Sequence, residues 1–213
     1  MKKTILIACL LCTVYAAAQT YAFDFVTKYA LNAKDDKRQE SVVYFNSDDF
    51  SYNLRLQKFP DRFRAILIDE DEKTAHRFDV AESRIKGEIV FSFTYTDSFK
   101  LNGTIKTYSR NEVSEIPGNP KQVLMKVYHS KRAKKPSHEH LLTLQPANKN
   151  LFAMYSISRS HAPFSLMNKS VDYPGNYIVV RDEITEGKVK CELVLEEHRN
   201  VELVLNLPKK LNF

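Results

Sequence analysis

The chain has 213 residues, of which 43% are hydrophobic and 27% charged, and its formal net charge is +6. This composition is typical of a folded globular domain and excludes a disordered chain. The two closest of its 5 glycines, Gly175 and Gly187, are twelve positions apart. Glycine-rich phosphate loops and the nucleophile elbow of serine hydrolases are therefore excluded, because each needs closely spaced glycines.

The N-terminus has the pattern of a secretory signal peptide. Lys2 and Lys3 precede an apolar run over residues 5–14, and small residues follow up to Ala18. The run has the length of a signal-peptide core and is too short to span a membrane. We expect cleavage after Ala18, with a cut after Ala22 as the alternative, and therefore a signal peptide over residues 1–18 and a single β-rich domain over residues 19–213.

Export changes which partners and which cysteine chemistry are expected. The mature chain loses Lys2 and Lys3 and carries +4, and it retains only Cys191. One cysteine cannot form an internal disulfide, and Cys191 lies on the apolar side of an alternating run, as a small buried hydrophobe would. A basic protein in the periplasm or outside the cell meets anionic membrane surfaces or envelope proteins, and we expect no nucleic acid partner.

The body of the chain alternates apolar and polar residues with the period of a β-strand. Turn-rich segments separate the runs, and short connections favour antiparallel neighbours. We expect a mainly β fold of eleven or twelve strands, an antiparallel meander curled into a barrel or half-barrel with one or two short helices. The residues that share one face of each main run are, in chain order, Phe23 and Phe25; Tyr52, Leu54 and Leu56; Phe63, Ala65 and Leu67; His76, Phe78 and Val80; Phe91, Phe93 and Tyr95; Val123, Met125 and Val127; Leu193 and Leu195; Val201, Leu203, Leu205 and Leu207.

Two segments interrupt the alternation and predict short helices. Residues 109–112 read Ser-Arg-Asn-Glu, which matches a capping box, and the helix would end before Pro117. A second helix is expected from Pro163 to about Lys169, because proline suits the first helical turn.

The signal peptide, the continuous meander and the few helical insertions together resemble the periplasmic half-barrels of the LolA/LppX type. The resemblance is one of pattern over residues 23–213. It implies a curved sheet whose covering helices enclose an apolar cavity for acyl chains. The run at residues 43–54 also resembles secreted proteins of unknown function from Bacteroidota.

Phe91, Phe93 and Tyr95 form an aromatic face on one predicted strand. Such a face lines an apolar cavity in one interpretation and fills an ordinary sheet core in the other. In the first interpretation the three residues bind the hydrophobic part of a ligand.

The densest cluster of charge lies between two predicted strands, in a hairpin loop. Its basic residues are Lys131, Arg132, Lys134 and Lys135. They are either a solvated loop or a contact for acidic headgroups at a membrane surface. By contrast, the acidic run at residues 69–72 predicts a solvated hairpin tip and no calcium site, because it has no glycine to sharpen the loop.

Two histidines of one predicted strand, His138 and His140, point the same way, and His129 of the preceding strand lies opposite if the hairpin closes. Three imidazoles hold zinc only if their nitrogens converge on one ion. The three histidines are therefore candidate zinc ligands. The simpler interpretation is that they are exposed strand residues that bind no metal.

These observations predict an exported protein that binds a hydrophobic or lipid-like ligand without catalysis and without a cofactor. An envelope protein that serves a structural role or binds another protein is the first alternative. A zinc-dependent hydrolase built on the three histidines is the second.

Overall fold

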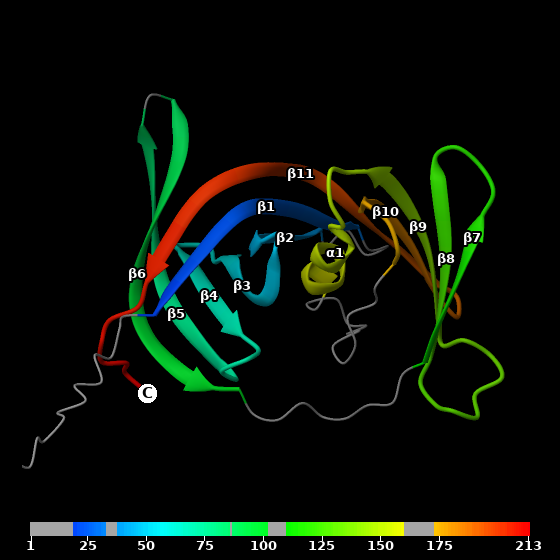
Figure 1. Ribbon diagram of the computed structural model, residues 1–213, viewed down its shortest axis with the longest axis horizontal. Helices are drawn as coiled ribbons and strands as arrows, with labels where there is room; N and C mark the ends of the chain where they lie inside the picture. Colours follow the sequence, from blue (N-terminus) through cyan, green and yellow to red (C-terminus); the bar gives the residue numbers. More distant parts are fainter. Residues whose placement is uncertain (1–18, 33–37, 86, 102–109, 160–172) are drawn as a thin grey trace, which may run out of the picture.

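The computed structural model of the protein describes residues 19–32, 38–85, 87–101, 110–159 and 173–213. Within these residues the chain forms 11 strands and one short helix (Figure 1). In chain order they are β1 (Thr20–Asn32), β2 (Gln39–Asn46), β3 (Asp49–Lys58), β4 (Phe63–Asp69), β5 (Thr74–Ile85), β6 (Glu88–Lys100), β7 (Arg110–Ile116), β8 (Lys121–Tyr128), β9 (His138–Pro146), α1 (Phe152–Ser158), β10 (Tyr177–Glu186) and β11 (Val189–Asn206).

All 11 strands belong to one antiparallel sheet with the order β6-β5-β4-β3-β2-β1-β11-β10-β9-β8-β7. Each strand pairs with the next one along the chain, except that β6 and β7 do not pair, and the last strand returns to pair with the first at the centre of the sheet. The sheet is strongly curved and stays open, with β6 and β7 at its edges (Figure 1). The predicted mainly β fold, an antiparallel meander curled into a half-barrel, is confirmed.

The central strands β1 and β11 are long and bent, and they arch together over α1 (Figure 1). Their pairing register shifts twice, between Phe23 and Phe25 and between Lys28 and Tyr29. Such irregularities let a strand bend and twist more sharply than a regular ladder allows. They therefore account for the curvature that carries one sheet around three hydrophobic clusters.

Residues 43–45 of β2 are all buried. Successive residues of a strand point to opposite sides, so this part of β2 is covered on both faces. Tyr44 packs into a cluster built around Leu54, which we call the Leu54 cluster. Its neighbours Val43 and Phe45 pack instead with Met154 of α1. The helix therefore lies against the face of β2 opposite to the Leu54 cluster. A further cluster, around Met125 of β8, fills the curve of the other half of the sheet.

The helix expected from the capping box at residues 109–112 is wrong, because Arg110–Ile116 forms β7. This strand pairs with β8 along its whole length. Glu112, expected to reach back to a helix N-terminus, instead accepts a hydrogen bond from the Tyr128 hydroxyl (2.8 Å). A short isolated helix is marginal in water, so pairing with an available strand prevails. The helix expected from Pro163 to Lys169 lies outside the described residues, as does the segment 1–18.

Helix α1 was not expected from the sequence. Its N-cap residue, Leu151, makes no capping hydrogen bond through its side chain, and no acidic residue lies in its first turn. Asn150, which precedes the N-cap residue, satisfies one free amide of the first turn, because its Oδ1 accepts a hydrogen bond from the Phe152 amide (3.0 Å). The helix instead owes its stability to the burial of one side against the sheet. No helix among the described residues is long and apolar enough to cross a membrane.

The acidic hairpin tip at residues 69–72 differs from expectation at its first residue. Asp69 is the last residue of β4 and is buried, and it accepts a hydrogen bond from the Tyr21 hydroxyl (2.7 Å). It also accepts one from the backbone amide of Glu72 (2.8 Å), which closes the turn. Only the remaining three carboxylates are exposed at the tip.

Candidate functional site

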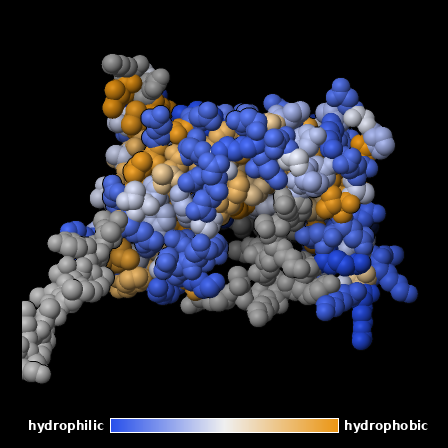
Figure 2. Space-filling model, in the orientation of Figure 1, coloured by the Kyte–Doolittle hydropathy of each residue, from blue (hydrophilic) through white to orange (hydrophobic). Residues whose placement is uncertain are grey.

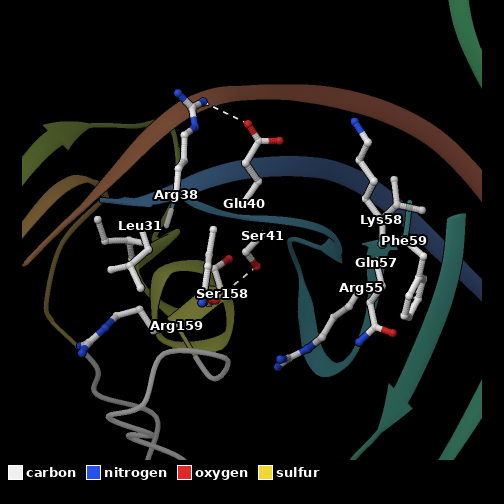
Figure 3. A pocket seen from close by; sticks show the side chains of 13 residues that line it. Leu31, Arg38, Glu40, Ser41, Arg55, Gln57, Lys58, Phe59, Ser158 and Arg159 are labelled. Atoms are coloured by element: carbon white, nitrogen blue, oxygen red, sulfur yellow. Dashed lines mark hydrogen bonds and ion pairs between the residues drawn. The ribbon is translucent and has the colours of Figure 1, made fainter. Parts of the chain in front are cut away.

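A pocket of about 560 Å³ lies where the C-terminal end of α1 meets four strands of the sheet (Figure 3). Strands β1, β2, β3 and β11 each contribute to its wall. Most of its side chains are apolar or basic, and the others are neutral polar side chains and the carboxylate of Glu40. The apolar group is Leu31, Leu56, Phe59 and Leu193, and the basic group is Arg38, Arg55, Lys58 and Arg159.

The end of α1 is attached to the sheet by hydrogen bonds to its last carbonyls. Arg55 of β3 donates from Nη2 to the Ile157 carbonyl (3.2 Å), and Ser41 of β2 donates from Oγ to the Ser158 carbonyl (3.3 Å). The final carbonyls of a helix have no partner within the helix, so side chains that donate to them satisfy buried acceptors. These contacts attach the end of α1 to β2 and β3 at the wall of the pocket.

Two of the four basic residues have carboxylate partners. Arg38 forms ion pairs with Glu40 (3.0 Å) and Glu196 (2.5 Å) near the surface. Arg159, which is only 1% exposed, lies 3.4 Å from the carboxylate of Asp182 through its Nε. Figure 3 shows Arg38, Glu40 and Lys58 along one side of the pocket and Arg55 and Arg159 along the other.

The other two basic residues have no carboxylate within ion-pair distance among the described residues. Arg55 is 8% exposed, and its only other hydrogen-bond acceptor among the described residues is the side-chain oxygen of Asn53 (2.9 Å). Burial lowers the pKa of the Arg55 guanidinium to about 10, and the charge of Glu70 opposes this only in part. Lys58 is exposed at the rim. The pocket therefore has an excess of positive charge.

Behind Arg159 lies a buried polar network centred on Asp182, which is 0% exposed. Its Oδ2 accepts a hydrogen bond from the Tyr155 hydroxyl (2.6 Å), and its Oδ1 lies 3.1 Å from Nδ1 of His140. Arg159 in turn donates from Nη1 to the Tyr155 hydroxyl (2.7 Å). Burial lowers the pKa of His140, although its bond to Asp182 opposes the shift. The network joins α1 to β9 and β10 without exposing a reactive group to solvent.

The three histidines proposed as zinc ligands do lie side by side. The rings of His129 and His138 meet edge to face with centroids 5.1 Å apart, and those of His138 and His140 stack at 6.3 Å. His138 also contacts Glu186 through Nε2 (3.3 Å). No group of three His, Cys, Asp or Glu residues in the described part of the chain is placed to hold a metal ion. The zinc-hydrolase alternative therefore gains no support.

Phe91, Phe93 and Tyr95 pack against the Leu54 cluster and do not line the pocket. Each ring makes an edge-to-face contact with a residue of another strand. The pairs are Phe91 with Phe63 (5.6 Å), Phe93 with Tyr44 (6.1 Å) and Tyr95 with Phe78 (6.0 Å). Their positions correspond to the interpretation in which they fill a core.

Lys131, Arg132, Lys134 and Lys135 are exposed in the loop between β8 and β9, as the hairpin interpretation predicted. None of the four lines the pocket. Cys191 is half-buried beside the Met125 cluster, and burial raises the pKa of its thiol. A raised pKa disfavours the thiolate that a nucleophile needs.

Sequence reasoning missed Arg55, Arg159 and Asp182. Arg55 alternates with Leu54 and Leu56, which is the pattern of a solvent-facing strand residue. No local pattern distinguishes it, because its burial depends on a helix that follows 102 residues later in the chain.

No protein-family model matches the chain, and no curated protein matches it. The class of protein is therefore defined by the fold and the pocket alone: an open, curled antiparallel sheet with one basic and apolar pocket beside its helix. The resemblance to LolA/LppX-type half-barrels stays an expectation.

Proposed function

We propose that this is an exported protein of the periplasm or cell exterior that binds a hydrophobic or lipid-like ligand without catalysis. The observation that carries the proposal is the pocket at the end of α1. Its volume of about 560 Å³ lies within the range of small-molecule sites, which are typically about 300–1,000 Å³. Four apolar side chains contribute to its wall, as such a ligand requires.

The chemistry of the wall supports binding rather than catalysis. The described residues that line the pocket include no histidine, cysteine or aspartate. Their one carboxylate, Glu40, forms ion pairs with Lys28 (3.1 Å) and Arg38 (3.0 Å). The hydroxyl of Ser41 donates to a helix carbonyl and has no neighbouring base in that wall. A nucleophile needs an adjacent general base to become reactive.

Native mass spectrometry of residues 19–213, purified from the periplasm without detergent, tests the proposal. We expect an extra mass that disappears on extraction with organic solvent. The variant Gln57→Trp places a large ring in the pocket wall and should abolish the extra mass. The matched control Gln145→Trp alters an exposed residue of β9 outside the pocket and should retain it. A clean mass for the unaltered protein would overturn the proposal.

One further observation favours the alternative of an envelope interaction protein. The hairpin of β5 and β6 projects beyond the body of the molecule (Figure 1), and hydrophobic surface gathers near it (Figure 2). Ile85, Ile89 and Val90 are 56%, 48% and 39% exposed there. Exposed apolar patches often mark interaction sites. Co-purification of one stoichiometric envelope protein, lost in the Ile85→Ser/Ile89→Ser double variant, would favour this alternative.

A further inference from the structure

We propose that the ligand of this pocket carries an oxyanion, a carboxylate or a phosphate, that binds to Arg55. The inference rests on the proposed function and specifies its ligand class. It separates an anionic amphiphile, with a charged head and an apolar tail, from a neutral lipid.

The first support is the environment of Arg55, whose buried charge has no carboxylate within ion-pair distance among the described residues and is compensated only in part by the charge of Glu70. Its two hydrogen bonds to described residues go to neutral acceptors, the Asn53 side chain and the Ile157 carbonyl. Buried charges in proteins are almost always paired, because removal from water is costly without a counter-charge. Because no carboxylate among the described residues pairs with Arg55, we infer that an anionic ligand supplies its counter-charge.

The second support is that Arg55 still has donors to offer. A guanidinium presents five N–H groups in a planar fork, which matches the geometry of carboxylate and phosphate oxygens. The two bonds described use one donor from Nε and one from Nη2. These bonds also hold the side chain in one orientation at the pocket wall, so an arriving oxyanion meets a preorganised partner.

The third support is the charge balance of the pocket as a whole. Glu40 and Glu196 compensate Arg38, and Asp182 compensates Arg159. Nη2 of Arg159 is nevertheless buried without a hydrogen-bond partner among the residues that the structure describes. Lys58 at the rim adds a second cation without a carboxylate partner among the described residues. Such a surplus draws anions toward the pocket and raises their rate of association.

The apolar part of the wall accounts for the rest of the ligand. Leu31, Leu56 and Leu193 line the same pocket as Arg55. Burial of a hydrocarbon tail contributes binding free energy in proportion to the apolar area removed from water. An oxyanion head and an aliphatic tail together match both chemistries of the wall.

Calorimetric titration of residues 19–213 with three probes that share a twelve-carbon chain tests the inference. Dodecanoate carries a carboxylate, dodecyl phosphate carries a phosphate, and monododecanoylglycerol is neutral. We expect at least one anionic probe to bind about tenfold or more tighter than the neutral probe, as a charge-assisted hydrogen bond provides. The stronger of the two anionic probes identifies the head group.

Variants at Arg55 then locate the effect. Arg55→Gln should bring the anionic probes to the affinity of the neutral one, and Arg55→Lys should keep part of the preference. Arg64→Gln is the matched control, because Arg64 is exposed on β4, pairs with Asp79 (3.7 Å) and does not line the pocket. It should leave all three affinities unchanged.

The outcomes separate this inference from the function on which it rests. Equal affinity of the unaltered protein for neutral and anionic probes overturns the oxyanion site and leaves a hydrophobic binding protein. Binding of none of the probes contradicts both. Should Arg55→Gln fail to fold, Lys58→Gln and sodium chloride serve instead. Each must weaken binding of the anionic probes and leave binding of the neutral one unchanged, and if either fails to do so the inference is wrong.

Discussion

The hydroxyl of Tyr155 donates a hydrogen bond of 2.6 Å to the carboxylate of Asp182. This bond joins α1 to β10 in a region where both side chains are fully buried. Helix α1 has only 7 residues and lacks a side-chain cap, so tertiary contacts must hold it in place. Because the end of the same helix forms one wall of the pocket, this buried bond also positions the candidate binding site.

We predict that Asp182→Asn destabilises the protein by about 3–5 kcal/mol, because it leaves the buried Arg159 without its counter-charge. Urea denaturation monitored by circular dichroism measures the change in the free energy of unfolding. Glu183→Gln on the same strand is the control, since Glu183 is half-exposed and pairs with Arg181 at the surface. Its effect should stay within about 0.5 kcal/mol. Equal effects for the two variants would show that the buried network contributes nothing particular.

We predict that stability falls as the pH drops below 6.5. Burial lowers the pKa of His76, His138 and His140, each from an ordinary value of 6.5. Below pH 6.5 the unfolded chain therefore binds protons that the folded chain does not, which favours unfolding. Each histidine contributes up to about 1.4 kcal/mol per pH unit between its two pKa values. Above this window all three are neutral in both states and contribute no pH dependence.

Urea midpoints at about pH 7.5 and about pH 5.5 measure this effect before most carboxylates titrate. The midpoint should be lower at the acidic pH, and His140→Gln should reduce the difference between the two. A midpoint that stays constant or rises as the pH falls would contradict the burial of these histidines.

We predict that Tyr21→Phe costs about 1.5–3 kcal/mol, the usual range for a hydrogen bond to a charged group. The Tyr21 hydroxyl is one of the donors that satisfy the buried carboxylate of Asp69. The control Tyr177→Phe removes a hydroxyl that makes no hydrogen bond among the described residues, and should change stability little. In a double-mutant cycle with Asp69→Asn, additive effects would exclude the coupling that the structure shows.

We predict that Phe93→Ala destabilises the protein by about 2–3 kcal/mol, below the range for a fully buried phenylalanine because the ring is partly exposed. It should leave any bound ligand in place, since Phe93 packs against Tyr44 and lies outside the pocket wall. Thermal unfolding and native mass spectrometry measure the two effects. The control Phe213→Ala removes a ring that is 68% exposed, and should change stability little. Loss of the ligand without loss of stability would instead favour the cavity interpretation of this aromatic face.

The strands were predictable from sequence because burial of one face of a strand requires apolar residues at every second position, and this alternation is visible in the strand's own sequence. The run Phe63, Ala65 and Leu67 predicts β4 in this way, and the structure places β4 over Phe63–Asp69. The prediction of a helix starting at the capping box of residues 109–112 was wrong, because a capping motif indicates only a local conformational preference. The pairing of Arg110–Ile116 with β8 supplies a full ladder of hydrogen bonds, which outweighs that preference.

The sequence by itself determined that this is a mainly β chain of antiparallel hairpins, with a basic loop between β8 and β9 and no glycine-rich catalytic loop. Only the tertiary structure decided which polar residues are buried. Arg55 has the local pattern of a surface residue, yet it is buried and donates a hydrogen bond to the end of α1. The pocket exists because segments distant in the chain meet there, and local periodicity carries no information about such contacts.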